Sequence, residues 1–371
     1  MGQLRRSNGQ AVQGRVTISD VADALGIAKG TVSRALNNYP DISDTTRQRV
    51  KRTAEAMGYR PLAQAQAIRT GRSRAIGLVL QTDIEGAQRP FLSDFLAGVS
   101  KTASDASWTL SVAMSAGGQD MLTTMGRLVD ERKADGFIVP RTFAVDQRAE
   151  LLRRLNVPFV LYGRLRDIQD SAWFDILGED AMKEAVLRLA VQGHTRIGFV
   201  NGDPIYNFSY LREAGFRDGM RQARLEVDEN LVGSHAMTRD LGATVTMSLL
   251  RHPKPPTAIV YAVDMAALGG YAAAEELGLS IGEDLSFISY DGIPECAWVR
   301  PKLTTFRVDT KMAGGRLVHL LIRQIRGEKP ETLRETAKAT LWPGGSDGAP
   351  TKTTEEIARH VLARGDNIHA I

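Results

Sequence analysis

Short apolar runs alternate with amphipathic stretches along most of the chain, and this alternation limits the folds open to it. The apolar runs occupy residues 75–80, 109–114, 136–139, 157–162, 196–200, 257–262 and 285–290. The stretches with helical periodicity occupy residues 90–106, 120–133, 179–192, 211–224, 239–250, 264–277 and 310–326. Strands buried on both faces read as continuous apolar runs, and a spacing of about thirty residues fits β-α-β units. We therefore expect an α/β fold of parallel sheets covered by helices, with a ligand crevice at the carboxyl ends of the strands.

The charge of the chain is unevenly distributed. Residues 1–74 hold 13 Lys and Arg against 5 Asp and Glu, a net charge of +8, whereas the rest of the chain carries −4. A compact basic segment is typical of a protein that binds nucleic-acid phosphates. Charge alone leaves a merely solvated charged surface as the alternative.

Three short helices are predicted within the basic segment. Apolar residues share one face of the first helix, namely Ile18, Val21, Ala22 and Leu25. Thr17 or Ser19 can cap this helix, and Gly26 ends it. A second helix follows over residues 28–36, and a third from a cap at Ser43 or Asp44 to Met57. Two short helices joined by a tight glycine turn form a helix-turn-helix, whose second helix enters the DNA major groove.

Several classes of protein are disfavoured. The single cysteine, Cys296, excludes an intrachain disulfide and a cysteine-based zinc cluster. No run of about 18 apolar residues is present, and the start of the chain lacks the apolar core of a secretory signal. The sequence contains none of the common catalytic motifs, such as a P-loop or a nucleophile elbow. We expect a cytoplasmic protein that is not an enzyme and has no cofactor, metal or membrane partner. A periplasmic-type sugar receptor and an α/β enzyme are the competing interpretations.

The segment VTISDVADALGIAKGTVSRALNN, followed by TTRQRV and MGYRP, resembles the N-terminal signature of the lactose-repressor (LacI/GalR) family of bacterial transcription regulators. The resemblance implies that the base-reading positions are Lys29, Gly30 and Arg34. Because glycine has no side chain, direct readout rests on Lys29 and Arg34, and an arginine forked onto guanine is the commonest specific contact. Phosphate contacts are implied for Thr31, Ser33, Asn37 and Arg47, and further DNA contacts for Thr17 and Tyr59.

Residues 61–74 resemble the hinge of the same family, which folds on operator DNA. Pro61 suits the first turn of a helix, and so short a helix is marginal in water without a partner. The resemblance places Ile68 at the position that wedges a base step open in the minor groove, where leucine is more usual. It also implies a DNA contact for Ala65. A flexible linker is the alternative interpretation.

The rest of the chain also resembles this family. The matching stretches include QGHTRIGFVNG, REAGF, AALGGYAAAEELGLSIGEDLSFISYDGIP and RPKLTTFRVD, so the resemblance covers about residues 16–330. It implies a periplasmic-binding-protein-like domain of two doubly wound parallel-sheet subdomains, with the ligand between them. The first subdomain is expected to hold about 75–161 and 292–320, and the second about 163–290 and the C-terminal segment.

The resemblance also implies effector contacts. Sugars are held by a few polar groups in a mostly apolar, aromatic pocket. Arg212 precedes the A-G-F turn, Asp291 follows the strand LSFISY, and Phe91 matches the aromatic residue of an N-P-F segment whose asparagine is replaced here. A salt bridge, a turn and a core position are the respective alternatives.

Two further features bear on the effector. Val263 stands where the family usually has asparagine, so Asp264 is expected to take over part of that role. Trp173 and Tyr206 lie on loops expected near the cleft. The segment GDPIYNF resembles family members that sense α-glucosides or other oligosaccharides.

We therefore predict five segments: a flexible N-terminus (1–15), a helix-turn-helix domain (16–60), a hinge (61–74), an effector-binding and dimerisation domain (75–345) and a C-terminal tail (346–371). The tail lacks leucine heptads, so a tetramerising coiled coil is not supported. The predicted function is that of a sequence-specific transcription regulator, a repressor. It is expected to bind double-stranded operator DNA as a homodimer under the control of a small-molecule effector, a carbohydrate.

Overall fold

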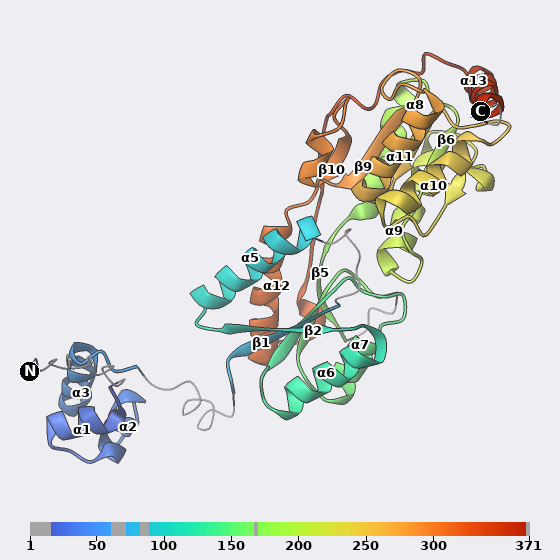
Figure 1. Ribbon diagram of the computed structural model, residues 1–371. Helices are drawn as coiled ribbons and strands as arrows, with labels where there is room; N and C mark the ends of the chain where they lie inside the picture. The colour runs from blue at the N-terminus through green and yellow to red at the C-terminus, as the bar shows by residue number, and fades with distance from the viewer. Residues whose placement is uncertain (1–15, 61–71, 82–88, 167–169, 369–371) are drawn as a thin grey trace, which may run out of the picture. The chain divides into compact units, whose positions relative to one another are not determined.

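The computed structural model describes residues 16–60, 72–81, 89–166 and 170–368, and the chain divides into two units, Met1–Ser73 and Arg74–Ile371 (Figure 1). The predicted hinge residues Ala65 and Ile68 lie outside the described residues. Each unit has its own buried apolar residues.

The first unit contains three helices, α1 (Ile18–Leu25), α2 (Lys29–Leu36) and α3 (Asp44–Ala56). Thr17 begins α1 with a capping box, in which its hydroxyl accepts from the amide of Asp20 while the Asp20 carboxylate accepts from the amide of Thr17. Gly26 ends α1 at φ 65°, a left-handed conformation that glycine adopts without strain. The three helices bury a small core of Val21, Ala22, Val32, Ala35, Val50 and Ala54.

The second unit contains two six-stranded sheets, which we call the N lobe and the C lobe together with their covering helices. The N-lobe sheet has the order β11-β5-β4-β3-β1-β2 and is parallel throughout. Its strands are β1 (Ala75–Gln81), β2 (Thr109–Ser115), β3 (Gly136–Pro140), β4 (Phe159–Tyr162), β5 (Ala172–Ile176) and β11 (Arg334–Ala337). Its helices are α5 (Arg89–Asp105), α6 (Gly118–Asp130), α7 (Gln147–Arg154) and α12 (Thr310–Ile325), with η3 (Pro330–Thr332) before β11.

The C-lobe sheet has the order β12-β10-β9-β8-β6-β7 and is parallel except for the pair β10 and β12. Its strands are β6 (Ile197–Val200), β7 (Val232–Gly233), β8 (Ala258–Tyr261), β9 (Ser286–Asp291), β10 (Thr304–Arg307) and β12 (Thr340–Trp342). Its helices are α8 (Gly178–Val191), α9 (Asn207–Gln222), α10 (Arg239–Leu250), α11 (Asp264–Leu277), α13 (Thr354–Ile368) and the short turns η1 (Glu229–Leu231) and η2 (Pro294–Ala297).

The predicted fold class is confirmed, but the predicted division into subdomains is wrong at two places. Strand β5 pairs with β4 and β11, so the chain leaves the N lobe after Ile176 rather than near residue 162. Strand β10 pairs in parallel with β9, so residues 304–307 belong to the C lobe and the chain returns only at α12. It crosses a third time between β11 and β12.

The segment predicted as a C-terminal tail contains α13, which packs on the C lobe. Ile357 and Val361 are buried against it, and two side chains of α13 meet the last turn of α11. His360 Nε2 lies 3.0 Å from the Leu277 carbonyl, and Arg364 donates to the Glu276 carbonyl at 3.2 Å. These contacts satisfy carbonyls that the end of a helix leaves unpaired.

Candidate functional site

The recognition helix predicted from the sequence, α2, presents its polar residues on one surface. Lys29, Gly30 and Arg34 are exposed, and Thr31, Ser33 and Asn37 are partly exposed. Val32 and Ala35 are fully buried on the opposite side. The apolar face therefore fixes the helix on α1 and α3 and leaves the predicted base-reading positions accessible.

The other predicted DNA-binding residues have structural contacts of their own. The hydroxyl of Thr17 caps α1, and Tyr59 packs beside the small core. Arg47 is mostly buried, with 21% of its side chain exposed. Its Nη2 donates to the carbonyls of Tyr39 at 3.1 Å and Ile42 at 2.9 Å. Arg47 thus holds the loop between α2 and α3, a role that the sequence did not reveal.

A cleft lies between the two lobes at the carboxyl ends of the strands. The N lobe contributes Arg141, Tyr162, Arg164 and Asp175, and the C lobe contributes Phe208, Arg212, Tyr290 and Asp291, among other residues. Parallel sheets place their strand ends at one edge, so groups far apart in sequence meet there. Two predicted effector residues, Arg212 and Asp291, are thereby brought together.

Arg212 and Asp291 face each other without forming a close ion pair. Their Nη2 and Oδ1 atoms are 3.8 Å apart. Arg212 Nη1 donates to the carbonyl of Ala262 at 2.6 Å, and its guanidinium carbon lies 4.0 Å and 4.5 Å from the ring centres of Tyr290 and Phe208. Asp291 ends β9 at φ 127°, an unusual conformation for a residue other than glycine.

Burial controls the protonation of the cleft acids. Burial raises the pKa of Asp291 to about 7, with Arg212 acting in the opposite direction. Burial likewise raises the pKa of Asp175 to about 6, although Arg164 Nε donates to it at 2.6 Å. Perturbed acids in a cleft are typical of functional sites.

Hydrogen-bond donors in the cleft are left unused. Within the described part of the chain, neither Arg141 Nη1 nor Arg212 Nε has a hydrogen-bond partner, and both atoms are buried. Buried polar groups in proteins are nearly always paired, and an unpaired one costs about 1–3 kcal/mol. Both arginines line the cleft that Asp291 also lines, so a hydrogen-bonding ligand there would meet donors and an acceptor together.

Comparison with known proteins finds relatives that match both the helix-turn-helix unit and the unit that holds the cleft. The description "Bacterial regulatory proteins, lacI family" matches residues 17–61, and "Periplasmic binding protein-like domain" matches residues 186–346. The HTH-type transcriptional regulator AglR of Rhizobium meliloti (strain 1021) is 33% identical over 91% of this chain and 96% of its own length. The chain belongs to the lacI family of bacterial regulatory proteins.

Further relatives within the lacI family agree. The HTH-type transcriptional regulator RafR of Escherichia coli is 30% identical over 91% of this chain and its whole length. The structure of the transcriptional regulator CelR in complex with cellobiose matches 90% of this chain, with a TM-score of 0.69 and 26% identity. The lac repressor dimer bound to operator shares the fold over 91% of this chain, with a TM-score of 0.74 and 24% identity. No helix in the described ranges is long and apolar enough to cross a membrane.

Three further predicted effector residues of this lacI-family protein, Asp264, Trp173 and Tyr206, are not among the described residues that line the cleft. Asp264 is fully buried, and its carboxylate accepts from the amides of Gly292 and Ile293 at 2.6 and 2.9 Å and from the hydroxyl of Thr305 at 2.7 Å. It therefore supports the turn after Asp291 instead of facing a ligand. Among the residues that the structure describes around the cleft, neither Asp264 nor Trp173 is present. The side chain of Phe91, in α5, lies outside the described residues.

Tyr206 belongs to a contact between the lobes that we call the clasp, formed by residues 142–144 of the N lobe and 205–208 of the C lobe. The ring of Tyr206 is stacked between Phe143 at 5.3 Å and Phe208 at 5.4 Å. Backbone hydrogen bonds join Ala144 to Ile205 at 2.8 Å and Asn207 to Thr142 at 3.0 Å. Tyr206 thus connects the two lobes next to the cleft, which Thr142 and Phe208 of the clasp also line.

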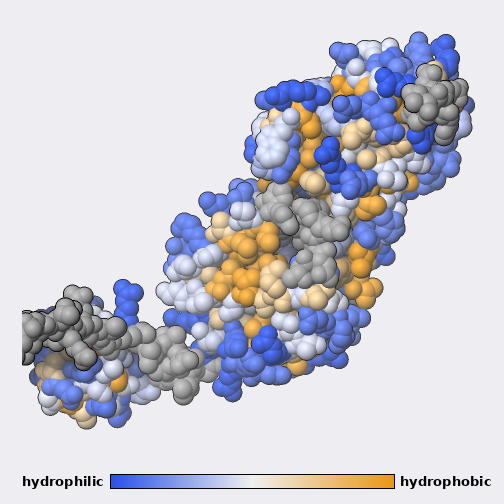
Figure 2. All heavy atoms as spheres, in the orientation of Figure 1, coloured by the Kyte–Doolittle hydropathy of each residue, from blue (hydrophilic) through white to orange (hydrophobic). Residues whose placement is uncertain are grey.

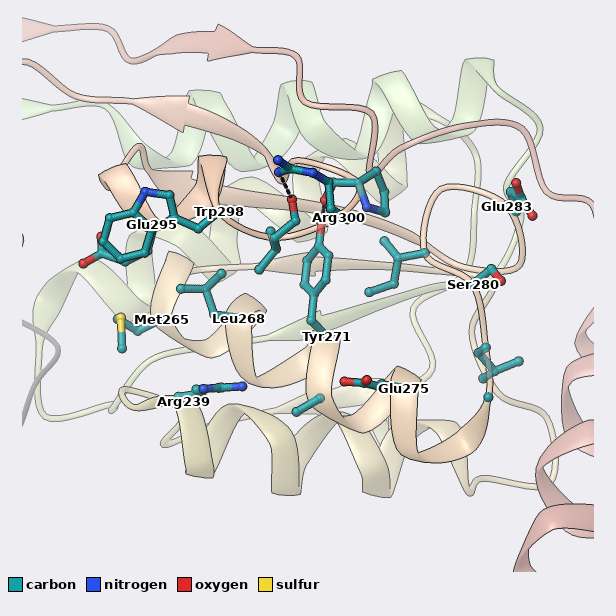
Figure 3. A pocket seen from close by; sticks show the side chains of 16 residues that line it. Arg239, Met265, Leu268, Tyr271, Glu275, Ser280, Glu283, Glu295, Trp298 and Arg300 are labelled. Carbon is teal, nitrogen blue, oxygen red and sulfur yellow. Dashed lines mark hydrogen bonds between the residues drawn. The ribbon is translucent and has the colours of Figure 1, made fainter.

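A second pocket opens on the C lobe beside α11. It is lined by Met265, Leu268 and Tyr271 of that helix and by the segments 278–283 and 295–301 (Figure 3). Trp298 lies at one end of the pocket with 71% of its surface exposed. Charges of both signs surround these apolar side chains: Arg239 and Arg300, with Glu275, Glu283 and Glu295.

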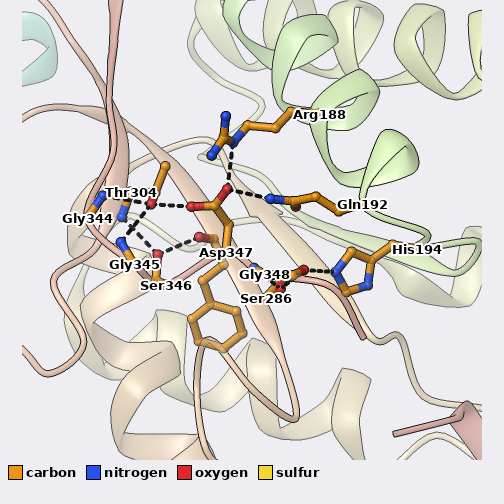
Figure 4. Close-up of polar contacts among 11 residues, drawn as sticks. Arg188, Gln192, His194, Ser286, Thr304, Gly344, Gly345, Ser346, Asp347 and Gly348 are labelled. Atoms are coloured by element: carbon orange, nitrogen blue, oxygen red, sulfur yellow. Dashed lines mark hydrogen bonds and ion pairs between the residues drawn. The ribbon is translucent and has the colours of Figure 1, made fainter. Parts of the chain in front are cut away.

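The segment LWPGGSDGAP, residues 341–350, is anchored on the C-lobe sheet (Figure 4). The buried Asp347 carboxylate accepts from Arg188 at 2.5 Å, Thr304 at 2.5 Å and Gln192 at 3.1 Å. Ser346 donates to the carbonyl of Phe287 at 2.6 Å. These hydrogen bonds join the segment to α8, β9 and β10, so the segment has a structural role.

Proposed function

We propose that this chain is a transcriptional repressor whose operator binding is controlled by a neutral, hydroxyl-rich effector in the interlobe cleft. The single observation that carries this proposal is the arrangement of Asp291 opposite Arg212 and Arg141. It offers a carboxylate acceptor together with two guanidinium groups in an aromatic surrounding. Adjacent hydroxyls can donate to the carboxylate and accept from the arginines, while the rings cover the apolar faces of a sugar.

The charges of the cleft favour a neutral effector. Once Asp291 is ionised, the guanidinium groups of Arg141, Arg164 and Arg212 are matched in the described part of the chain by three carboxylates, Asp175, Glu179 and Asp291. A phosphorylated or carboxylated ligand would bring a further buried charge without a partner, which is costly. The relative solved with cellobiose supports an oligosaccharide as the effector. The segment GDPIYNF, which resembles members that sense α-glucosides, is the ground for proposing an α-glucoside.

On the DNA side, we propose that Arg34 and Lys29 read bases and that Thr31, Ser33 and Asn37 contact phosphates. Their exposure on α2 supports this assignment. The hinge, with Ala65 and Ile68, stays a prediction, as do the cytoplasmic location and the lack of enzymatic activity. Arg34→Ala should weaken operator binding by roughly 1–3 kcal/mol without unfolding the protein.

The active unit is proposed to be a homodimer. Half-sites on DNA are read by two-fold dimers, and a two-fold interface must be complementary to itself. The second pocket fits this requirement because its apolar centre is surrounded by both arginines and glutamates. On the N lobe, β2 is an edge strand that exposes Val112 and Met114, and Figure 2 shows hydrophobic surface on this lobe.

A thermal-shift screen tests the effector proposal. The full chain is heated with neutral mono- and disaccharides and with their phosphorylated counterparts. A ligand at 100 times its Kd should stabilise the protein by about 2.7 kcal/mol. The hit should release the protein from its operator, and Asp291→Ala should abolish the response while leaving ligand-free DNA binding intact. Stabilisation by phosphorylated sugars alone, or an unchanged response in the variant, would contradict the proposal.

A further inference from the structure

The loop between α2 and α3 holds the side chain of Arg34 from two sides. Asp41 forms an ion pair with Arg34 through Oδ2 and Nη2. The guanidinium carbon of Arg34 also lies 5.5 Å from the centre of the Tyr39 ring, within the range of a cation–π contact. Asp41 and Tyr39 are separated from Arg34 by only a few residues, yet they belong to the loop and not to the helix.

This loop is itself fixed by α3. Arg47 donates to the carbonyls of Tyr39 and Ile42, and Lys51 Nζ donates to Asn38 Oδ1 at 2.9 Å. The amide of Tyr39 donates to the Arg34 carbonyl at 3.1 Å, which closes the end of α2. The Asp41 carboxylate and the Tyr39 ring therefore contact Arg34 from a loop that is held in place by α3.

Stability does not explain the ion pair. The side chains of Arg34 and Asp41 are 52% and 44% exposed, and exposed pairs of this kind contribute little to folding. An acid beside the recognition helix also opposes the attraction of the basic segment to DNA phosphates. Asp41 is therefore expected to weaken binding to DNA of any sequence and to add little to the stability of the fold. What it can improve is the preference of the protein for its own operator over other DNA.

We infer that Asp41 and Tyr39 are positioning residues that hold Arg34 in the orientation required to read a guanine, and that Asp41 reduces binding to other DNA. The inference rests on the proposed base-reading role of Arg34. A guanidinium has five N–H donors, so the pair with Asp41 leaves enough of them for O6 and N7 of guanine. When Arg34 enters the major groove and water is excluded, the ion pair between Arg34 and Asp41 becomes stronger. An Arg34 side chain that does not meet a guanine then leaves buried donors unpaired, which lowers the affinity for that sequence.

The test uses the full chain and a binding site selected from a pool of random duplexes. Affinities for the selected site and for unrelated DNA are measured by fluorescence anisotropy over a range of salt concentrations. Asp41→Asn should tighten binding to unrelated DNA, steepen its salt dependence and reduce the ratio of specific to non-specific affinity about tenfold. Asp41→Glu, which keeps the negative charge, should retain most of the wild-type ratio of specific to non-specific affinity. The melting temperature should not change in either variant.

Asp23→Asn is the matched control, because it removes the same charge from an exposed acid on α1. It should leave the specificity ratio close to that of the wild type. If Asp23→Asn and Asp41→Asn lower the specificity ratio equally, net charge alone explains the effect and the inference is wrong. The inference is also wrong if Arg34→Ala lowers the specificity ratio and Asp41→Asn does not. If Arg34→Ala binds the selected site normally, the proposed base-reading role fails as well.

Discussion

Effector affinity should rise with pH between 6 and 8, because the ionised carboxylate of Asp291 accepts stronger hydrogen bonds from hydroxyl groups than the protonated acid does. Burial raises the pKa of Asp291 to about 7, while Arg212 lowers it and the nearby Asp264 raises it further. With a pKa near 7, roughly one molecule in eleven carries the carboxylate at pH 6, and roughly ten in eleven at pH 8. Affinity should therefore increase about tenfold, or about 1.4 kcal/mol.

Among the other titrating groups discussed for the cleft, only Asp175 overlaps this pH range. The pKa of Asp175 is about 6, so Asp175 contributes mainly at the lower end. Burial raises the pKa of Tyr162 and Tyr290, which stay neutral throughout. An Asp291→Asn variant should bind the effector weakly at every pH and lose the tenfold dependence.

The stability of the ligand-free protein should change in the opposite direction. Asp291 has a higher pKa in the folded state than its ordinary value of 3.8, so the folded state binds more protons than the unfolded state between about pH 4 and 7. Its contribution to the free energy of unfolding is present at low pH and is lost as the pH rises through about 7. This opposite sign separates the effect on binding from a general loss of structure.

Isothermal titration calorimetry at pH 6, 7 and 8, at constant ionic strength, measures the effect with the effector identified by the thermal-shift screen. The reasoning is refuted if the Kd is the same at pH 6 and pH 8. It is also refuted if Asp291→Asn retains the pH dependence of the wild type, since another group would then be responsible.

Three further predictions concern other parts of the molecule. Asp347→Ala should lower the free energy of unfolding by about 2–3 kcal/mol in denaturant titrations, because hydrogen bonds to a buried carboxylate are lost; an unchanged midpoint would contradict the role of this network. Tyr206→Ala removes two stacked pairs, each worth about 0.5–1.5 kcal/mol, so it should shift operator release to a different effector concentration in anisotropy titrations, whereas an unaltered release curve would exclude the clasp from the response. Trp298→Glu should raise the dimer dissociation constant at least tenfold in sedimentation experiments, and a dimer of unchanged affinity would place the interface elsewhere.

The sequence located most strands of the fold because a strand buried on both faces is a continuous apolar run. Strands β1, β3, β6 and β8 begin and end within about one or two residues of the predicted runs. Five strands were missed, β5, β7, β10, β11 and β12, and two of them show why. Strand β5, AWFDI, alternates between buried and partly exposed residues and carries Asp175 toward the cleft, and β11, RETA, lies at a sheet edge. Neither shows the apolar run on which the prediction depended.

The candidate site was predictable only in part. Arg212 and Asp291 follow recognisable motifs, and the fold brings them within 3.8 Å. Arg141 and Arg164 were missed because they follow strand ends whose place in the cleft depends on the order of the sheet. Asp264, by contrast, was predicted to face the effector but lies outside the described cleft lining. A sequence shows that an acid is present, but it does not show that the carboxylate already accepts hydrogen bonds from two backbone amides and a hydroxyl.

Two arginines that line the cleft, Arg141 and Arg212, also contact the clasp between the lobes. Arg141 lies over the ring of Tyr206 at 5.8 Å, and Arg212 lies over Phe208 at 4.5 Å. A ligand that draws these guanidinium groups into new hydrogen bonds must change their position over the rings, and each such contact is worth about 0.5–2 kcal/mol. That is comparable to the 1–3 kcal/mol that typically couples two allosteric sites. We therefore expect occupancy of the cleft to affect the angle between the lobes through these two side chains, without a longer chain of intermediates.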